Sequence, residues 1–146
     1  NYIEAFARAG ADIISFHIEA FDYSIEKSKK VIALIRRYGK RPAVAINPPP
    51  PLKRIIPLLK SIDWVLVMTV HPGFGGQKFM EEVVPKIEAL RAIYKKDIEI
   101  DGGINNKNAS IVVQAGANIL AAGSFLFRAK NMSHAVRSLK NAYQGR

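Results

Sequence analysis

The residues best suited to chemistry in this chain are one aspartate and three glycine-containing turns, each of which follows a short apolar run. Asp101 ends the run 98–100 and is followed by Gly102 and Gly103. A carboxylate at a strand end can transfer a proton or bind a metal ion, and two glycines open space for a phosphate. The alternative is an aspartate that caps the next helix or turn, since Asp-Gly-Gly is also a turn signal.

The densest glycine cluster lies in the loop 71–78, where Gly73, Gly75 and Gly76 surround Phe74. Closely spaced glycines let backbone N–H groups approach an anion, and the N-terminus of a following helix adds favourable partial charge. The loop matches neither the P-loop pattern nor G-x-G-x-x-G. A mobile connecting loop without a ligand therefore stays open as the alternative.

A third candidate is the pair Gly123 and Ser124, which follows the apolar residues 119–122. The pair offers a backbone N–H group, a hydroxyl group and a helix start. Phosphate sites of (β/α)₈ barrels commonly use the loops after strands seven and eight. Taken alone, a Gly-Ser pair is more simply explained as a plain turn.

The histidines and one methionine are weaker candidates. His17 lies in an apolar run and could face the centre of a barrel, whereas His71 and His134 are expected at the surface. Met68 either fills the core or covers a ligand as a flexible cap. None of these four residues defines a site by itself.

The composition is that of a globular domain without thiol chemistry. The chain has 146 residues, 49% of them hydrophobic, which suffices for one core. Without cysteine there is no disulfide, thiolate nucleophile or cysteine-bound metal, so any metal must rest on His, Asp, Glu or water. No apolar run approaches the roughly 20 residues that span a bilayer, and residues 1–10 suggest an amphipathic helix instead of a signal peptide. We expect a cytoplasmic protein without a membrane partner.

The net charge of +10 does not by itself indicate a nucleic-acid partner. The basic residues are spread along the chain, many of them on the expected helix 25–38, which favours solvated helix faces. Aromatic residues are not interleaved on a basic face, as they are in single-strand binders. We therefore expect no nucleic-acid binding, and a diffuse attraction for anionic substrates as a by-product of the charge.

Short β-branched runs alternate with segments of helical period, which predicts an α/β fold with a parallel sheet covered on both faces. Ser24 is the expected N-cap of one helix, and Pro57 and Pro85 are expected to break or kink two others. The predicted strands are 12–18, 43–46, 64–70, 98–100 and 119–122. The predicted helices are 2–9, 25–38, 52–61, 79–95, 110–114 and 133–143.

These elements form one predicted domain, residues 1–146, whose architecture the pattern leaves open. The order of strands and helices fits either a doubly wound sheet or part of a (β/α)₈ barrel. A complete barrel typically needs about 250 residues, so five strands would be a fraction of one.

Together the motifs resemble the ribulose-phosphate 3-epimerase family. Residues 64–79, which contain V-M-T-V-H-P-G-F-G-G-Q-K-F, are similar to its sixth strand and active-site loop. Residues 98–104 resemble its seventh strand and 115–127 its eighth. Upstream, 11–20 resembles the fourth strand and 44–48 the fifth, so the resemblance covers essentially the whole chain in order.

The resemblance implies a TIM (β/α)₈ barrel, of which this chain would hold the C-terminal five strands without the first three βα units. It implies the interconversion of D-ribulose 5-phosphate and D-xylulose 5-phosphate by proton transfer at C3 through an enediolate, in the pentose phosphate pathway. A divalent metal ion (Zn, Fe, Mn or Co) would be held by two histidines and two aspartates. Asp101 matches one of these aspartates, as metal ligand and as acid/base. The substrate loop matches Gly73, Phe74, Gly75 and Gly76, and the phosphate cradle matches Gly102, Gly103, Gly123 and Ser124.

Most of the family's metal site lies outside this chain. In the family, the first three strands supply a serine, a His-x-Asp pair and a second histidine, and neither His17 nor His71 matches a ligand. Two alternatives stay open, namely an epimerase of a related ketose phosphate such as allulose 6-phosphate, and a catalytically incomplete partial barrel. Two unpaired sheet edges would favour a homo-oligomer.

Overall fold

The sheet contains five parallel strands whose spatial order is their order in the chain. The structure is a computed structural model that describes residues 2–143. A doubly wound sheet would reverse its strand order at a switch point, whereas here each strand pairs with the next, as in a (β/α)₈ barrel. The strands are β1 (Ile13–His17), β2 (Arg41–Ile46), β3 (Trp64–Met68), β4 (Asp97–Asp101) and β5 (Ile119–Ala121).

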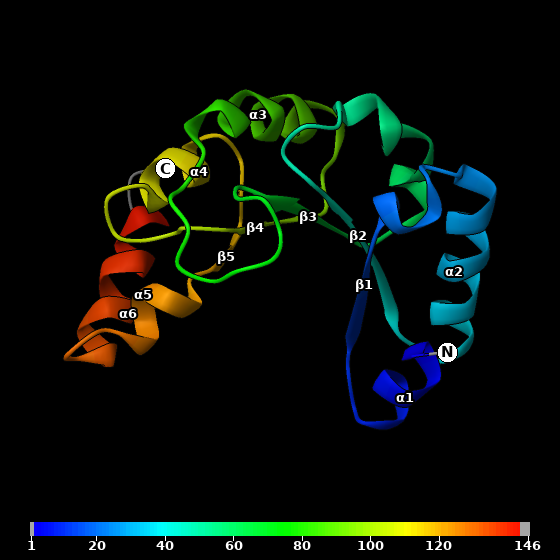
Figure 1. Cartoon of the computed structure of the whole chain (residues 1–146), viewed down its shortest axis with the longest axis horizontal. Coiled ribbons are helices and arrows are strands. Elements are labelled where there is room, and N and C mark those ends of the chain that lie inside the picture. Colours follow the sequence, from blue (N-terminus) through cyan, green and yellow to red (C-terminus); the bar gives the residue numbers. More distant parts are fainter. Residues whose placement is uncertain (1, 144–146) are drawn as a thin grey trace.

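The helices lie along the outside of the arched sheet, so that the fold resembles an open arc of a barrel (Figure 1). The α-helices are α1 (Tyr2–Arg8), α2 (Ile25–Arg37), α3 (Val84–Ile93), α4 (Ala109–Gln114), α5 (Gly123–Phe127) and α6 (Met132–Lys140). The 3₁₀ turns are η1 (Ile18–Phe21), η2 (Leu52–Arg54), η3 (Ile56–Ser61), η4 (Glu81–Val83) and η5 (Asn141–Tyr143).

The core lies between the sheet and the outer helices. Val65 and Ile98, on adjacent strands, are completely buried there, together with Ile87 and Leu90 of α3. The opposite face of the sheet is covered less well: Trp64 and other side chains that alternate with the core residues keep partial exposure. The expectation of strands covered on both faces therefore holds for β2, whose residues 42–46 are all buried, but is wrong for β4 and β5, whose inner face keeps partial exposure.

Helix α2 begins where the sequence predicts. The Ser24 hydroxyl accepts a hydrogen bond from the Lys27 backbone N–H over 3.3 Å, so it caps α2 as predicted. The helix ends at Arg37, and Gly39 follows with φ +69°, a conformation that costs glycine little.

Other element boundaries differ from the prediction. Residues 52–61 form two 3₁₀ segments, and the expected helix 79–95 is a 3₁₀ turn followed by α3. The breaks expected at Pro57 and Pro85 are therefore present. Pro85 lies in the first turn of α3, where its missing N–H has no intrahelical partner to lose, and Pro57 lies at the start of η3. The residues expected as a Gly-Ser turn begin the short helix α5.

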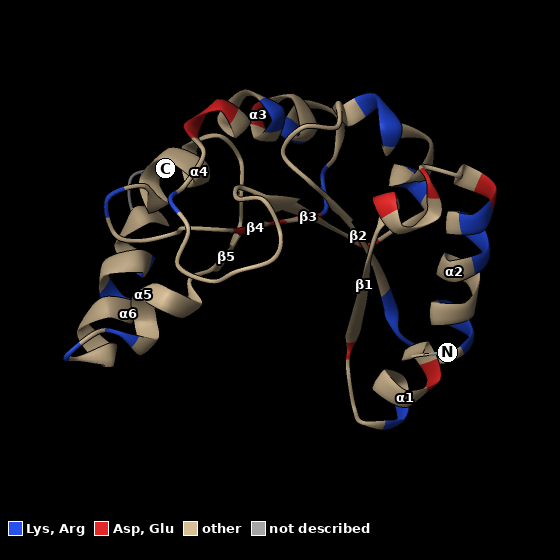
Figure 2. Cartoon of the chain, viewed as in Figure 1, with Lys and Arg blue, Asp and Glu red and all other residues tan. Residues whose placement is uncertain are grey.

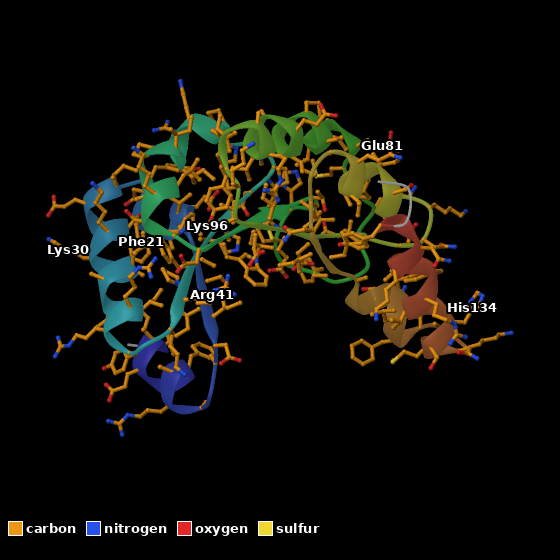
Figure 3. All side chains as sticks on the ribbon, turned by 180° about the vertical axis from the view of Figure 1, so that it is seen from behind. Phe21, Lys30, Arg41, Glu81, Lys96 and His134 are labelled. Carbon is orange, nitrogen blue, oxygen red and sulfur yellow. The ribbon has the colours of Figure 1, made fainter. Side chains whose placement is uncertain are left out.

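Charged residues are distributed over the outer helices and loops and do not form one basic face (Figure 2). Lys30 and His134 project from the outer surface (Figure 3). Asp63 makes a local network with Arg36 and Lys96 over 2.9 Å each. Burial opposes ionisation of Asp63, but the two cations outweigh it and lower its pKa. Among residues 2–143, no helix is long and apolar enough to cross a bilayer.

Candidate active site

Three carboxylates of β4 lie on the inner face of the sheet. Asp97, Glu99 and Asp101 alternate with Ile98 and Ile100, which are fully buried against the outer helices. Because side chains of a strand alternate between faces, the three acids point away from the helices. Asp101 is the last residue of the strand, so its carboxylate lies at the carboxyl edge of the sheet, where barrels carry their sites.

The two ends of β4 differ in electrostatics. At the amino end, Arg41 donates a hydrogen bond to Asp97 over 2.8 Å and Asn118 donates another over 2.9 Å, and both lower the pKa of the Asp97 carboxyl. At the carboxyl end, burial raises the pKa of Asp101. An aspartate with a raised pKa is better matched to accepting and returning a proton near neutral pH.

Glu99 lies between these two aspartates. Burial raises the pKa of Glu99, and the neighbouring charge of Asp101 raises it further, while a hydrogen bond from Trp64 Nε1 over 2.8 Å counteracts both. Within the described chain, the Asp101 carboxylate itself accepts no hydrogen bond. The alternative in which Asp101 caps the next helix or turn is therefore wrong, since a cap requires such a bond.

A hollow of about 310 Å³ lies at the carboxyl ends of β3, β4 and β5. It brings together the residues of all three glycine-containing turns, although Gly73 and Ser124 are 51 positions apart in the sequence. Met68 also lines the hollow and is only 7% exposed, so its buried side chain forms part of the wall of the site. The predicted site residues in its lining are Gly73, Phe74, Gly75, Gly76, Asp101, Gly102, Gly103, Gly123 and Ser124.

Gly102 and Gly103 allow two loops to pack, which is not the reason that the sequence suggested. A Cβ on Gly102 would lie 2.7 Å from Val70 N, and one on Gly103 would lie 2.5 Å from Phe79 N. Both positions also have positive φ, +134° and +66°. Loop packing therefore requires glycine at both positions, and their part in binding a phosphate stays a prediction. Open space exists instead at Gly123, where a Cβ would meet nothing within 4 Å.

Two polar side chains that sequence reasoning left without a role hold the glycine-rich loop. Gln77 Nε2 donates to the carbonyl oxygens of His71 and Phe74, over 2.6 and 2.8 Å. The buried Thr69 hydroxyl donates to the Gly102 carbonyl over 2.7 Å and ties this loop to the next one. Gln77 was visible as an amide at the end of a glycine cluster, but its partners depend on how the loop folds back.

We expect that Gln77→Ala loosens the loop without unfolding the domain. The variant loses two hydrogen bonds, each worth about 1 kcal/mol net, that hold the carbonyl groups of His71 and Phe74, so the NMR backbone order parameters of residues 73–76 should fall. Gln114→Ala, an exposed glutamine at the end of α4, is the matched control and should leave these order parameters unchanged. Equal order parameters in both variants would show that Gln77 does not hold the loop.

A second polar cluster lies at the carboxyl ends of β1 and β2. His17, the last residue of β1, places its Nδ1 3.4 Å from Glu19 Oε2. Glu19 Oε1 accepts a hydrogen bond from the Asn47 backbone N–H over 2.9 Å. His71 and His134 are exposed, as expected, and His71 lines the hollow beside the glycine-rich loop.

Lys86 of α3 anchors the proline-rich loop after β2. Its ammonium group donates to the carbonyl oxygens of Asn47, Pro48 and Pro50 over 3.0, 2.5 and 2.8 Å. Burial lowers the pKa of Lys86, an effect that Glu19 opposes. We expect Lys86→Met to lower the free energy of unfolding by about 2 kcal/mol, because three carbonyls lose a charged donor. Urea denaturation, with the exposed Lys30→Met as control, would detect the difference; equal values would contradict it.

The described residues do not by themselves fit a metal centre. Among residues 2–143, no three His, Asp or Glu side chains come close enough to hold an ion together. Asp101 can supply one carboxylate ligand, but His17 and His71, the histidines near predicted strand ends, do not join it in such a group. Any metal ion would therefore need ligands from outside this set.

Comparison with known proteins agrees with this geometry. The model of the family described as "Ribulose-phosphate 3 epimerase family" matches residues 1–127. The chain belongs to the ribulose-phosphate 3-epimerase family. The ribulose-phosphate 3-epimerase of Bacillus subtilis is 42% identical over 97% of this chain, and the cytoplasmic isoform of Oryza sativa is 40% identical over 99%. Strands β3, β4 and β5 and the loops after them therefore lie in the part of the chain that matches the epimerase family.

The match spans only part of these relatives. The chain covers 66% of the Bacillus subtilis epimerase and 64% of the rice epimerase. Among solved structures, the 3-hexulose-6-phosphate synthase of Salmonella typhimurium superposes with a TM-score of 0.74 and 18% identity, over 98% of this chain and 66% of that one. At that identity the similarity shows the fold alone. It confirms the α/β barrel-type architecture that the epimerase motifs implied.

Proposed function

We propose that the protein containing this chain interconverts D-ribulose 5-phosphate and D-xylulose 5-phosphate by moving a proton at C3. The observation that carries the proposal is the single hollow that joins Asp101 to all three glycine-containing turns. The relatives named ribulose-phosphate 3-epimerase support the same reaction. We also propose that the protein lies in the cytoplasm and acts on a small phosphosugar. It is proposed to bind neither nucleic acid nor a membrane.

Asp101 is the proposed acid/base of this segment. Its carboxylate would take the C3 proton from one face of the sugar and return it in the reverse reaction, and its raised pKa favours this exchange near neutral pH. The opposite face requires a second acid/base, which none of the matched residues of this chain supplies. The epimerisation site is therefore shared with residues outside this segment.

The substrate's phosphate is proposed to bind at the open side of the hollow. Gly123 has free space on its side-chain face, and Ser124 adds a hydroxyl group at the same strand end. The backbone N–H groups of Gly76 and Gly103 donate to no other atom of the described chain, so they are free to bind a phosphate oxygen. Phe74 is 87% exposed and lies in the loop that would cover the sugar.

The family implies a divalent metal ion, which when bound would stabilise the negative charge that develops on the enediolate oxygens. Asp101 is the one matched ligand here, and its carboxylate is free of other hydrogen bonds within residues 2–143. Zn, Fe, Mn and Co are all compatible with His and Asp ligands. The remaining ligands are proposed to come from the segment that corresponds to the family's first three strands.

The test is an assay of the full-length protein, loaded with metal, on D-ribulose 5-phosphate and on allulose 6-phosphate. We expect faster turnover of the pentulose phosphate. The residues of the described site are proposed to bind the phosphate and the enediolate, and none of them is assigned to the far end of the sugar chain. Preference for the hexulose phosphate would therefore favour the related ketose-phosphate epimerase instead. Failure on both substrates would favour the catalytically incomplete barrel.

A homo-oligomer is proposed from the sheet edges. Within the described residues, β1 and β5 each pair on one side only, and unpaired edges promote association. Light scattering of the 146-residue chain would give its mass in solution, and a monodisperse monomer would contradict the proposal.

A further inference from the structure

A second hollow, of about 370 Å³, lies beside the proposed phosphate site. Gly76, Gly103 and Ser124 line both this hollow and the one that contains Asp101. The two hollows therefore adjoin at residues of the proposed phosphate site. A phosphate bound at this site can be contacted from the catalytic side and from the second hollow.

Arg128 is the one basic residue in the lining of the second hollow. Its Nη2 lies 3.3 Å from the position that a Cβ on Gly76 would take, so the guanidinium rests against the glycine-rich loop. Arg128 follows α5 directly, and its backbone N–H bonds to the Ser124 carbonyl oxygen over 3.3 Å. One helical turn therefore connects the guanidinium to the hydroxyl of the cradle.

Within the described part of the chain, no hydrogen bond or ion pair explains the position of the Arg128 side chain. Among residues 2–143, no Asp or Glu forms an ion pair with it, whereas Arg36 and Arg41 each pair with an aspartate. A guanidinium beside unpaired backbone N–H groups creates a local excess of donors and positive charge. Its planar fork is suited to two phosphate oxygens at once.

We infer that Arg128 binds the phosphate monoester of the ligand from the second hollow, as a specificity-determining cation for the dianion. The inference rests on the proposed function, because it takes the cradle to be the phosphate site. Arg128 lines the second hollow and not the one that contains Asp101, so it contributes to binding and not to proton transfer. No part of the cradle besides Arg128 carries a formal positive charge, which makes this side chain the main source of discrimination against neutral sugars.

The experiment measures the affinity of the full-length protein for inorganic phosphate by calorimetry. Arg128→Gln removes the charge at nearly constant size, Arg128→Lys keeps the charge but loses the fork, and Arg137→Gln is the matched control on α6. We expect about tenfold weaker binding for Arg128→Gln, as for one exposed charge-assisted contact, roughly threefold for Arg128→Lys, and no change for Arg137→Gln. Circular dichroism checks that each variant is folded.

A kinetic measurement separates binding from chemistry. With the pentulose phosphate, Arg128→Gln should raise KM and leave kcat unchanged, and raising the salt concentration should weaken native binding more than binding by the variant. If Arg128→Gln binds phosphate as tightly as Arg137→Gln does, the role of Arg128 is overturned and the proposed function stays intact. Absence of phosphate binding by the native protein would overturn both. If Arg128→Gln does not fold, Arg128→Ala takes its place. A folded Arg128→Ala variant that binds phosphate as tightly as the native protein would contradict the inference.

Discussion

Asp101→Asn in the full-length protein is expected to lower epimerase turnover about a thousandfold, within the range of about 10²–10⁴ for loss of a general acid/base. Asparagine keeps the size of the side chain but cannot take up a proton. The carboxylate makes no hydrogen bond with the described residues, so the fold should tolerate the change. Turnover is measured on D-ribulose 5-phosphate, and incorporation of solvent deuterium at C3 reports the proton transfer directly.

Asp97→Asn is the matched control for this experiment. It makes the same chemical change on the same face of β4, but at the amino end of the strand, where Asp97 pairs with Arg41 over 2.8 Å. It should leave turnover near native and lower stability slightly, because the pair is partly exposed and screened by solvent. An Asp101→Asn enzyme within tenfold of native, with deuterium still entering at C3, would show that another group transfers the proton.

Gly103→Ala is expected to lower the free energy of unfolding by about 4 kcal/mol. The substitution combines strain at φ +66° with a Cβ that would lie 2.5 Å from Phe79 N and 2.9 Å from Gln77 O. Backbone atoms cannot move aside as a flexible side chain does, so the two loops must separate. Urea denaturation measures the change, and ligand affinity should fall with it.

Gly39→Ala separates strain from contact. Gly39 has φ +69°, close to that of Gly103, but a Cβ there would meet nothing within 4 Å. We expect a loss of only about 1 kcal/mol, the usual cost of a positive φ for alanine. A difference of less than about 1 kcal/mol between the two variants would show that the loops adjust easily and that Gly103 is not needed for their packing.

Several features of this protein are determined by the sequence by itself, because they depend on neighbouring residues. The alternation of apolar runs and helical periods predicted all five strands, and Ser24 predicted the start of α2. The order of the glycine-containing motifs carried the resemblance to the epimerase family, which the match over residues 1–127 confirms. The residues of the candidate site were likewise named before their spatial relation was known.

Other features were decided only by the tertiary structure, because they depend on residues that are distant in the chain. The strand order selected the barrel arc over the doubly wound sheet, which local periodicity does not distinguish. Gly102 and Gly103 serve the packing of two loops, and only the positions of Val70 and Phe79 reveal it. Arg128 lies beside Gly76 because α5 packs near a loop some fifty residues earlier in the chain. No local pattern in the sequence links these two residues.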